Sequence, residues 1–446
     1  MSGDDYERVG DLVTLVRGTT YKGALVGKPG PALLGLGSIV PGGGFRAGDF
    51  KTYGGECPEQ LMLRPGDLYV SLKGATKDGE MIGSVAQVPS QVASGRLTQD
   101  TVKLVIAPEF EELRQYLYWL LRAPQYRAYC AGRATGSAVV ALSRDDFLAY
   151  PVPRFTAFRA AVVALLESLD DKIELNRRMN ETLEAMAQAI FRDWFVDFGP
   201  TRRKLEGTTD PVTIMGGLVQ DMGRAEALAD LFPVALGDDG LPEGWKKKAL
   251  LEEAKLISGG TPKTDREDYW DGGVPWASAK DVSQCGETLL LHTERNITQS
   301  GLANSSTKMV PKFSTVVVAR GATTGRYCMF AEDMAMNQTC YALYSTSGRP
   351  FLLYNMFGAL IGELVQAAHG SVFDTITTKT LATGSVIYVE GVAAAFENTV
   401  APLYEAIENN SRQNRMLSAT RDLLLPKLMS GEILFSEAED RLEAAQ

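Results

Sequence analysis

Histidine is scarce in this sequence: only His292 and His369 occur among 446 residues. Because histidine is the commonest general base and a preferred transition-metal ligand, triad chemistry and histidine-based metal sites are nearly excluded. The cysteines are odd in number, scattered and never arranged as C-x-x-C, so they indicate neither a disulfide framework nor a zinc site. They are Cys57, Cys130, Cys285, Cys328 and Cys340. We expect no metal site in this chain.

Three motifs of nucleotide and base chemistry are also missing. No G-x-x-x-x-G-K-[ST] occurs, which argues against an ATP-driven motor in this chain. The G-x-G-x-x-G of a dinucleotide site and the Asn-Pro-Pro-Tyr or Asp-Pro-Pro-Tyr of adenine methyltransferases are absent as well. Glu253-Ala254-Lys255 has the Glu-x-Lys spacing of a metal-dependent nuclease, but so short a pattern is common by chance. We therefore expect no catalytic activity and no cofactor bound by the chain itself.

Long apolar runs are absent too: none approaches the roughly 20 residues that span a bilayer. The first ten residues do not have the character of a signal peptide, so we expect a cytoplasmic protein. The net charge of −10 lowers the expectation of a nucleic-acid partner. It does not decide the matter, because acidic residues concentrate in the helical stretches and in residues 206–243, while the globular parts carry basic clusters.

The most informative feature present is an internal duplication. A helical stretch that begins at Phe158 is repeated from Phe396, so that Asn176 matches Asn414 and Arg177 matches Arg415. The globular parts repeat more faintly, since an apolar run followed by Lys73-Gly74-Ala75-Thr76 matches one followed by Arg320-Gly321-Ala322-Thr323. Gly136-Ser137 and Gly370-Ser371 form a further pair, in the same order along the chain. The sequence therefore predicts two copies of one module, a globular domain followed by a long helix.

Both helical stretches carry apolar residues at alternating spacings of three and four, which is the seam of a coiled coil. Polar residues interrupt both seams, and Asn176 and Asn414 could meet in an antiparallel pair because they are equivalent. The alternative is that each helix only covers its own domain. Against it, about 40 residues at 1.5 Å each extend roughly 60 Å, more than one compact domain can cover. We favour a coiled-coil spacer, and expect Pro426 to end or kink the second helix. The seam positions are 166, 169, 173, 176, 180, 183, 187, 190 and 194, and 403, 407, 410, 414, 417, 421, 424 and 428.

The predicted fold class is mixed α/β, with two globular α/β domains joined by two long antiparallel helices in a pseudo-two-fold repeat. Glycine and proline punctuate short strands in both globular parts, and residues 200–243 are rich in turn-forming residues. The length allows about three domains. The expected division is a first domain at 1–155, a central helix at 156–199, a linker at 200–243, a second domain at 244–392, and a C-terminal helix and tail at 393–446.

The helical stretches SLDDKIELNRRMNETLEAMAQAIFRDWF and NRMLSATRDLLLPKLMSGEI, with LPEGWKKKALLEEAKLISGGTPKT from Leu241, closely resemble type I restriction–modification specificity subunits. The resemblance covers nearly the whole chain and is weakest inside the globular parts. It implies a DNA-binding scaffold whose two target-recognition domains read the halves of an asymmetric, bipartite site. It also implies partners: two methyltransferase subunits docked on the helices, and restriction subunits in a cleaving complex. S-adenosylmethionine, ATP and Mg²⁺ would then bind to those partners.

If the two domains read one face of the DNA about one turn (roughly 10 bp) apart, and each reads about 3–4 bp, a gap of roughly 6–7 bp follows. Phosphate contacts are expected from loop Lys, Arg, Ser and Thr, although an ordinary solvated surface residue is an alternative for each. The candidates are Lys73, Thr76, Lys77, Arg133 and Ser137 in the first domain, and Lys263, Lys280, Arg320, Thr323, Thr324, Arg326 and Ser371 in the second. Asn176, Arg177, Asn414 and Arg415 are the candidate organisers of the helix pair.

Three tempting features have simpler interpretations. Ser258-Gly259-Gly260-Thr261-Pro262-Lys263-Thr264 resembles a phosphate-binding loop but lacks the Gly-Lys-Ser/Thr ending, so a surface turn is favoured. Trp270 and Trp276 are expected to pack in the core or a turn rather than to stack on bases. His369 is expected to be a loop residue. Two other functions stay open: a protein-binding scaffold without DNA, which the acidic charge would suit, and a fused restriction–modification enzyme, which the missing motifs disfavour.

Overall fold

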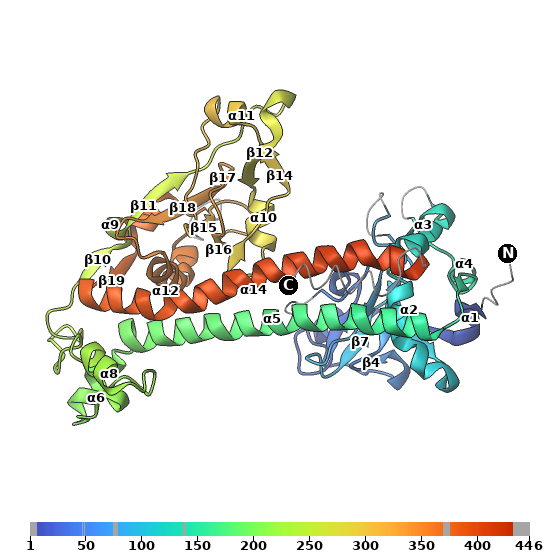
Figure 1. Ribbon diagram of the computed structural model, residues 1–446, viewed down its shortest axis with the longest axis horizontal. Helices are drawn as coiled ribbons and strands as arrows, with labels where there is room; N and C mark the ends of the chain where they lie inside the picture. The colour runs from blue at the N-terminus through green and yellow to red at the C-terminus, as the bar shows by residue number, and fades with distance from the viewer. Residues whose placement is uncertain are drawn as a thin grey trace. The chain divides into compact units, whose positions relative to one another are not determined.

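The computed structural model describes residues 7–46, 48, 50–74, 79–136, 140–368 and 375–430 (Figure 1). It confirms the predicted fold class, because two α/β domains are linked by long helices, α5 and α14, that pack against each other. By internal contacts the chain divides into two compact units, Met1–Ile173 with Met416–Gln446 and Glu174–Arg415. None of the described helices is long and apolar enough to cross a membrane.

The first unit is built on a four-stranded sheet of order β2-β8-β5-β6, in which all neighbours are antiparallel. Leu68 and Val70 of β5 pack into one apolar cluster and Tyr69 into another, because successive side chains of a strand point to opposite faces. The sheet is therefore buried on both sides, which explains the continuous apolar run in this strand. The strands are β2 (Val13–Arg17), β5 (Leu68–Ser71), β6 (Val85–Gln87) and β8 (Thr101–Ile106).

Smaller elements complete this unit. A three-stranded sheet has the order β3-β7-β4, and a two-stranded one pairs β1 with β9. The strands are β1 (Glu7–Arg8), β3 (Ala32–Leu34), β4 (Met62–Leu63), β7 (Gly95–Leu97) and β9 (Pro151–Val152). The α-helices are α1 (Val9–Leu12), α2 (Arg114–Leu120), α3 (Pro124–Arg133) and α4 (Arg144–Leu148), and α2 and α3 contribute much of the larger apolar cluster.

The second unit repeats the same sheet, in the order β11-β18-β15-β16-β13. Its first four strands correspond in order and direction to β2, β8, β5 and β6, and helix α12 (Pro350–Ala368) packs on β15 and β18. Val316 and Val318 enter one apolar cluster and Val317 the other, so this sheet too is buried on both faces. The strands are β11 (Ala254–Ser258), β13 (Leu289–Leu290), β15 (Thr315–Val318), β16 (Tyr327–Phe330) and β18 (Cys340–Ser345).

Two smaller sheets flank this one, β14-β12-β17 and β10-β19. Their strands are β10 (Lys247–Ala249), β12 (Trp270–Ala277), β14 (Arg295–Ile297), β17 (Ala335–Met336) and β19 (Ser385–Ile387). The short helices around them are α9 (Leu250–Glu253), α10 (Ala279–Gln284), α11 (Gln299–Ala303) and α13 (Thr378–Thr383).

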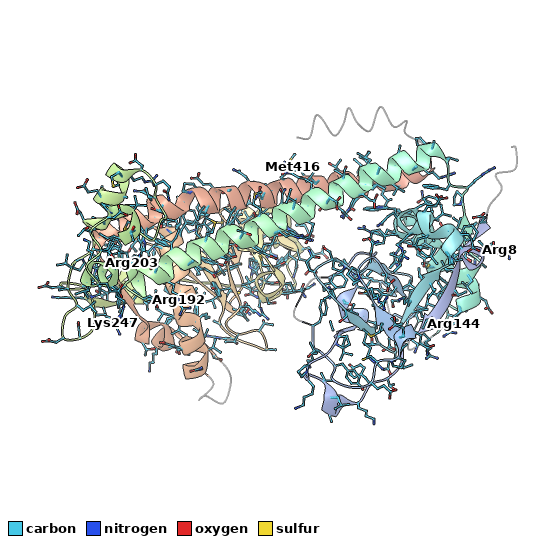
Figure 2. The ribbon with its side chains drawn as sticks, turned by 90° about the horizontal axis from the view of Figure 1, so that it is seen from below. Arg8, Arg144, Arg192, Arg203, Lys247 and Met416 are labelled. Carbon is cyan, nitrogen blue, oxygen red and sulfur yellow. The ribbon has the colours of Figure 1, made fainter. Side chains whose placement is uncertain are left out.

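The segment 200–243 was interpreted from the sequence as a connection with one short helical patch near 224–231. It contains three short helices, α6 (Gly199–Leu205), α7 (Pro211–Ile214) and α8 (Met222–Ala229), of which α8 overlaps that patch. They are fixed to the end of α5. The guanidinium of Arg203 donates to both carboxylate oxygens of Asp193, at 3.0 and 2.8 Å, and Figure 2 shows Arg203 beside this end of the helix. Trp194, Phe232 and Trp245 pack together in the same apolar cluster.

The two long helices are α5 (Ala157–Phe195) and α14 (Glu390–Ser430), of 39 and 41 residues. The predicted seam of α5 is buried or half-buried throughout, from Leu166 to Trp194. In the second unit, the amide nitrogen of Asn176 donates to Asn414 at 2.9 Å, and that of Asn410 donates to Asn180 at 2.9 Å. Numbers rise on one helix as they fall on the other, so the pairing is antiparallel.

Of the two outcomes expected at Pro426, an end or a kink, the end does not occur, because helix α14 continues to Ser430. Its last described part belongs to the first unit, where Leu417, Leu424 and Leu425 join the same apolar cluster as Leu166 and Leu169 of α5.

Candidate nucleic-acid interface

The two basic Gly-Ala-Thr segments occupy the same position in the two sheets. Lys73 follows the end of β5, where Ser71 pairs with Thr101, and its backbone bridges to Ala141. Arg320 follows the end of β15, where Val318 pairs with Cys340, and its backbone bridges to Thr375. The structure thus places one basic side chain at the same end of each sheet, which we call the basic end.

Not all of the predicted cations are free of acidic partners. Lys73 lies 3.6 Å from Asp100, and Lys280 lies 2.7 Å from Glu294. Arg133 lies 3.9 Å from Asp146 and over the ring of Tyr129, 3.9 Å from its centre. These three ion pairs are exposed and therefore weak, so a DNA phosphate could replace the acidic partner at small cost.

The predicted residues of the second domain differ in exposure. Arg320, Thr323 and Arg326 are exposed, and neither arginine forms an ion pair with a described residue. Thr324 is half-buried, and its hydroxyl donates to the carbonyl of Gly321 at 2.7 Å, which closes the turn after β15. Thr76, Lys77, Ser137, Ser371 and His369 lie outside the described residues.

Trp270 and Trp276 pack inside the domain, as predicted, and they also hold a loop. Trp270 and Trp276 are both 6% exposed, with their rings edge to face at 5.2 Å. The indole N–H of Trp276 donates to the carbonyl of Gly260 at 3.0 Å, and that of Trp270 donates to the carbonyl of Lys263 at 3.2 Å. The candidate Lys263 is exposed on this loop.

One loop was missed from the sequence. Residues 18–22 follow β2 as residues 259–263 follow β11, and β2 and β11 are equivalent strands. The signal was present, because Gly18-Thr19-Thr20-Tyr21-Lys22 shares its glycine, its second threonine and its lysine with Gly259-Gly260-Thr261-Pro262-Lys263. The loop lies near the start of the chain, outside the stretches where the duplication is obvious.

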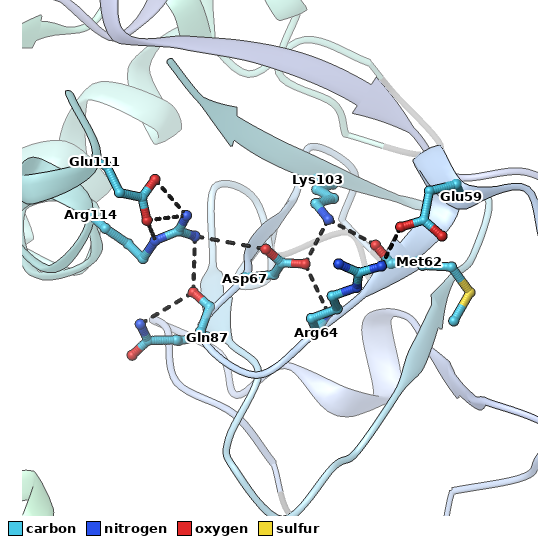
Figure 3. Close-up of polar contacts among 9 residues, drawn as sticks. Glu59, Met62, Arg64, Asp67, Gln87, Lys103, Glu111 and Arg114 are labelled. Carbon is cyan, nitrogen blue, oxygen red and sulfur yellow. Dashed lines mark hydrogen bonds and ion pairs between the residues drawn. The ribbon is translucent and has the colours of Figure 1, made fainter. Parts of the chain in front are cut away.

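The opposite end of the first sheet holds basic residues in structural ion pairs (Figure 3). Asp67 precedes β5 and accepts from Lys103 at 2.6 Å, and its other oxygen lies 3.8 Å from Arg114. Lys103 and Asp67 are 16% and 17% exposed, so this pair is mostly removed from water. Because these cations are already neutralised, the opposite end is a poor site for phosphate, and the basic end is the better candidate.

No metal centre is apparent: within the described parts of the chain, no group of three or more His, Cys, Asp or Glu side chains is placed to hold a metal ion. Glu253, from the nuclease-like pattern, instead accepts from Lys248 at 3.0 Å. This carboxylate therefore forms a structural ion pair.

Of the predicted organisers of the helix pair, Asn176 and Asn414 are buried and the two arginines are not. Arg177 is exposed, and Arg415, also exposed, reaches the carbonyl of Leu291 at 3.4 Å. On the outside of α5 in the second unit, Leu175, Met179 and Met186 are 53%, 44% and 45% exposed. Their spacing of four and seven residues places them along one face of the helix.

Residues 242–387 match a protein-family model described as "Type I restriction modification DNA specificity domain". Among characterised relatives, the chain is 29% identical to the type I restriction enzyme HindI specificity subunit of Haemophilus influenzae, over 61% of this chain and 66% of that protein. It is 24% identical to the type I restriction enzyme MjaIX specificity subunit of Methanocaldococcus jannaschii, over 78% of this chain and 75% of that protein.

Among solved structures, the chain resembles the crystal structure of a type I restriction–modification system S subunit from M. genitalium. The TM-score is 0.51 with 12% sequence identity, and the likeness covers 96% of this chain and 97% of the other. At this identity the likeness shows a common fold.

Proposed function

The chain belongs to the DNA specificity (S) subunits of type I restriction–modification systems, and we propose that it reads a bipartite, asymmetric DNA site, one half with each globular domain. The observation that carries the proposal is the repeated sheet with a basic residue, Lys73 or Arg320, at the same end of both copies. Two recognition domains of different sequence on one chain suit two different half-sites. Basic loop residues would contact phosphates, and the segments that differ would read bases.

The antiparallel pair of α5 and α14 is the proposed spacer between the half-sites. Its seam places Asn176 opposite Asn414 and Asn180 opposite Asn410, and buried polar pairs of this kind specify register. A fixed register fixes the spacing of whatever the helices carry. We propose a gap of roughly 6–7 bp, from half-sites of about 3–4 bp placed one turn apart.

S subunits are non-catalytic components of their complexes, so the chemistry falls to partner proteins. We propose two methyltransferase subunits, with restriction subunits added in a cleaving complex. S-adenosylmethionine, ATP and Mg²⁺ would bind to those partners.

The outer face of α5 is the proposed methyltransferase contact. Leu175, Met179 and Met186 form an exposed apolar stripe, and large apolar side chains clustered on a surface mark protein-binding sites. Replacing Met179 by Glu is expected to prevent recovery of the methyltransferase with this chain while leaving the thermal unfolding midpoint almost unchanged. The matched control is Glu181→Gln, another exposed position of α5. Retention of the partner by the Met179 variant would move the contact elsewhere.

The proposed function is tested by mapping N6-methyladenine across the genome of cells that contain the methyltransferase partner, with and without this chain. We expect one asymmetric, gapped motif to lose methylation when the chain is removed. Identical maps in a strain whose methyltransferase is active would overturn the proposal in favour of a protein-binding scaffold. Salt dependence separates the two, because DNA affinity falls steeply as salt rises.

A further inference from the structure

The loops after β2 and β11 leave their sheets from equivalent positions. The amide of Gly18 donates to the carbonyl of Thr101 at 3.0 Å, and that of Gly259 to the carbonyl of Cys340 at 3.4 Å. Thr101 and Cys340 are the first residues of the equivalent strands β8 and β18. Each loop therefore leaves its sheet at the basic end, two strands away from Lys73 or Arg320.

Both loops begin at a glycine that the structure requires. A Cβ atom on Gly18 would lie 1.7 Å from the carbonyl oxygen of Thr98, and one on Gly259 would lie 1.8 Å from that of Asn337. Since these neighbours are backbone atoms, no side-chain movement can relieve the clash. The path of the loop out of the strand is thus fixed in the same way in both domains.

A buried arginine, Arg96, binds the first loop, residues 18–22, from inside the domain. Arg96 is 3% exposed, and its guanidinium donates to the carbonyl of Thr20 at 3.0 Å and to the hydroxyl of Thr19 at 3.0 Å. It lies over the ring of Tyr53, 5.0 Å from the centre. No carboxylate of a described residue pairs with it, so its charge is compensated by carbonyl dipoles, the Thr19 hydroxyl and aromatic rings.

The second loop is held by neutral donors, and one of its two held carbonyls, that of Gly260, is equivalent to the Thr19 carbonyl that Arg96 reaches at 3.4 Å. The indoles of Trp276 and Trp270 occupy the carbonyls of Gly260 and Lys263. In each loop two carbonyls are bound by buried side chains, and the terminal lysine, Lys22 or Lys263, is exposed with no ion pair to a described residue. Positive charge is then what each loop presents outward, which suits an anionic oxygen.

We propose that residues 18–22 and 259–263 are a matched pair of sequence-independent phosphate contacts, one per recognition domain, with Arg96 and Trp276 as their positioning residues. The proposal rests on the proposed function and deepens it. Two domains that read different sequences have one ligand in common, the DNA backbone. A loop that keeps its glycine, its threonine and its lysine in both domains suits that common ligand, whereas base contacts must come from segments that differ.

The test measures DNA binding by the complex of the full chain with its methyltransferase, over a range of salt concentrations, for Lys22→Ala, Lys263→Ala and the double variant. Removing one lysine–phosphate interaction lowers the magnitude of the slope of log K against log salt by about 0.9. We expect that decrease in each single variant and twice that decrease in the double variant. Specific and non-specific duplexes should weaken by the same factor, and the methylated motif should stay the same.

Two exposed cations away from the basic end serve as controls. Arg64→Ala removes a cation at the opposite end of the first sheet, and Lys247→Ala removes one from β10 (Figures 2 and 3). Both should keep the wild-type slope. A wild-type slope in the Lys22 and Lys263 variants would overturn the proposal, as would a changed base preference in one half-site. A wild-type complex that shows no specific DNA binding would instead overturn the proposed function.

The positioning role is tested with Trp276→Phe, which keeps an aromatic ring but loses the N–H that binds Gly260. We expect it to weaken DNA binding without changing the motif. In the Lys263→Ala background it should add little, because both substitutions act on one contact. Full additivity of the two substitutions would show that Trp276 acts independently of the loop and would overturn its positioning role.

Discussion

The side-chain amide of Asn176 donates a hydrogen bond of 2.9 Å to Asn414, its own equivalent in the second half of the chain. At this pair, the two residues that face each other in the helix pair are also the two that match in the sequence repeat. It therefore marks the local pseudo-two-fold axis of the helix pair.

Removing one of these two amides should cost more than removing both. In Asn176→Leu the buried amide of Asn414 loses its partner, which costs about 1–3 kcal/mol of folding free energy. In the double variant Asn176→Leu/Asn414→Leu this pair of seam positions becomes apolar, and stability should return to the wild-type value or exceed it. Denaturant unfolding of the two singles and the double, as a double-mutant cycle, checks this. Additive losses would contradict it.

The ion pair between Asp67 and Lys103 should stabilise the first unit. Both groups are mostly removed from water, so Asp67→Asn leaves a lysine without its charge partner, and we expect a loss of about 2–4 kcal/mol. The matched control is Glu59→Gln, which breaks the pair with Arg64 at 77% and 70% exposure. There the loss should stay below about 1 kcal/mol. Similar thermal shifts for both variants would count against a structural role for the Asp67 pair.

Stability should depend on the charge of Glu397 in α14. This carboxylate accepts backbone N–H groups of Phe351 and Leu352 at the start of α12, but burial dominates and raises its pKa to about 7. A raised carboxyl pKa means that the folded state binds the proton more tightly than the unfolded state. The stability from that protonation is complete below about pH 4.5 and is lost as the pH rises through 7.

Glu397→Gln should remove this pH dependence, since an amide does not titrate. Its single oxygen can accept from only one of the two backbone N–H groups. At pH 8 the variant should be more stable than the wild type by roughly 2 kcal/mol, and near pH 5 the difference should be small. Denaturant unfolding at both pH values checks this. A larger gain at pH 5 than at pH 8 would contradict the assigned sign.

Lengthening the spacer should change the gap and not the half-sites. Seven residues added to both α5 and α14 preserve the seam and add about 10 Å of helix. At about 3.4 Å per base pair, the gap in the methylated motif should grow by about 3 bp. Insertion into α5 alone breaks the register and should abolish methylation. A lengthened pair that still methylates the original motif would show that the spacing is set elsewhere.

The helix seam was predictable because its signal is local and periodic. Every position from Leu166 to Trp194 follows from the spacing of residues on one helix, and the repeat itself paired Asn176 with Asn414. That the end of α14 belongs to the first unit was not predictable, because this depends on three leucines that join the apolar cluster of that unit.

The residues that hold the loops at 18–22 and 259–263 could not be predicted from the sequence. Arg96 and the threonine that it holds are 77 residues apart, and its acceptors are mainly carbonyls, which leave no pattern of residue types. Within 200–243, α6 and α7 were hard to predict for another reason. They are too short to show a period, and α6 is fixed by the contact between Arg203 and Asp193.

The shared apolar cluster of the first unit has a consequence for synthesis of the protein. Leu417, Leu424 and Leu425 complete that cluster, and Arg421 reaches Asp170 at 2.5 Å, yet all four residues leave the ribosome after the whole second unit. The first unit is therefore translated first, but its apolar cluster is completed last. A frameshift or stop codon near residue 416 would spare the recognition domain encoded beside it and damage the one encoded at the opposite end of the gene.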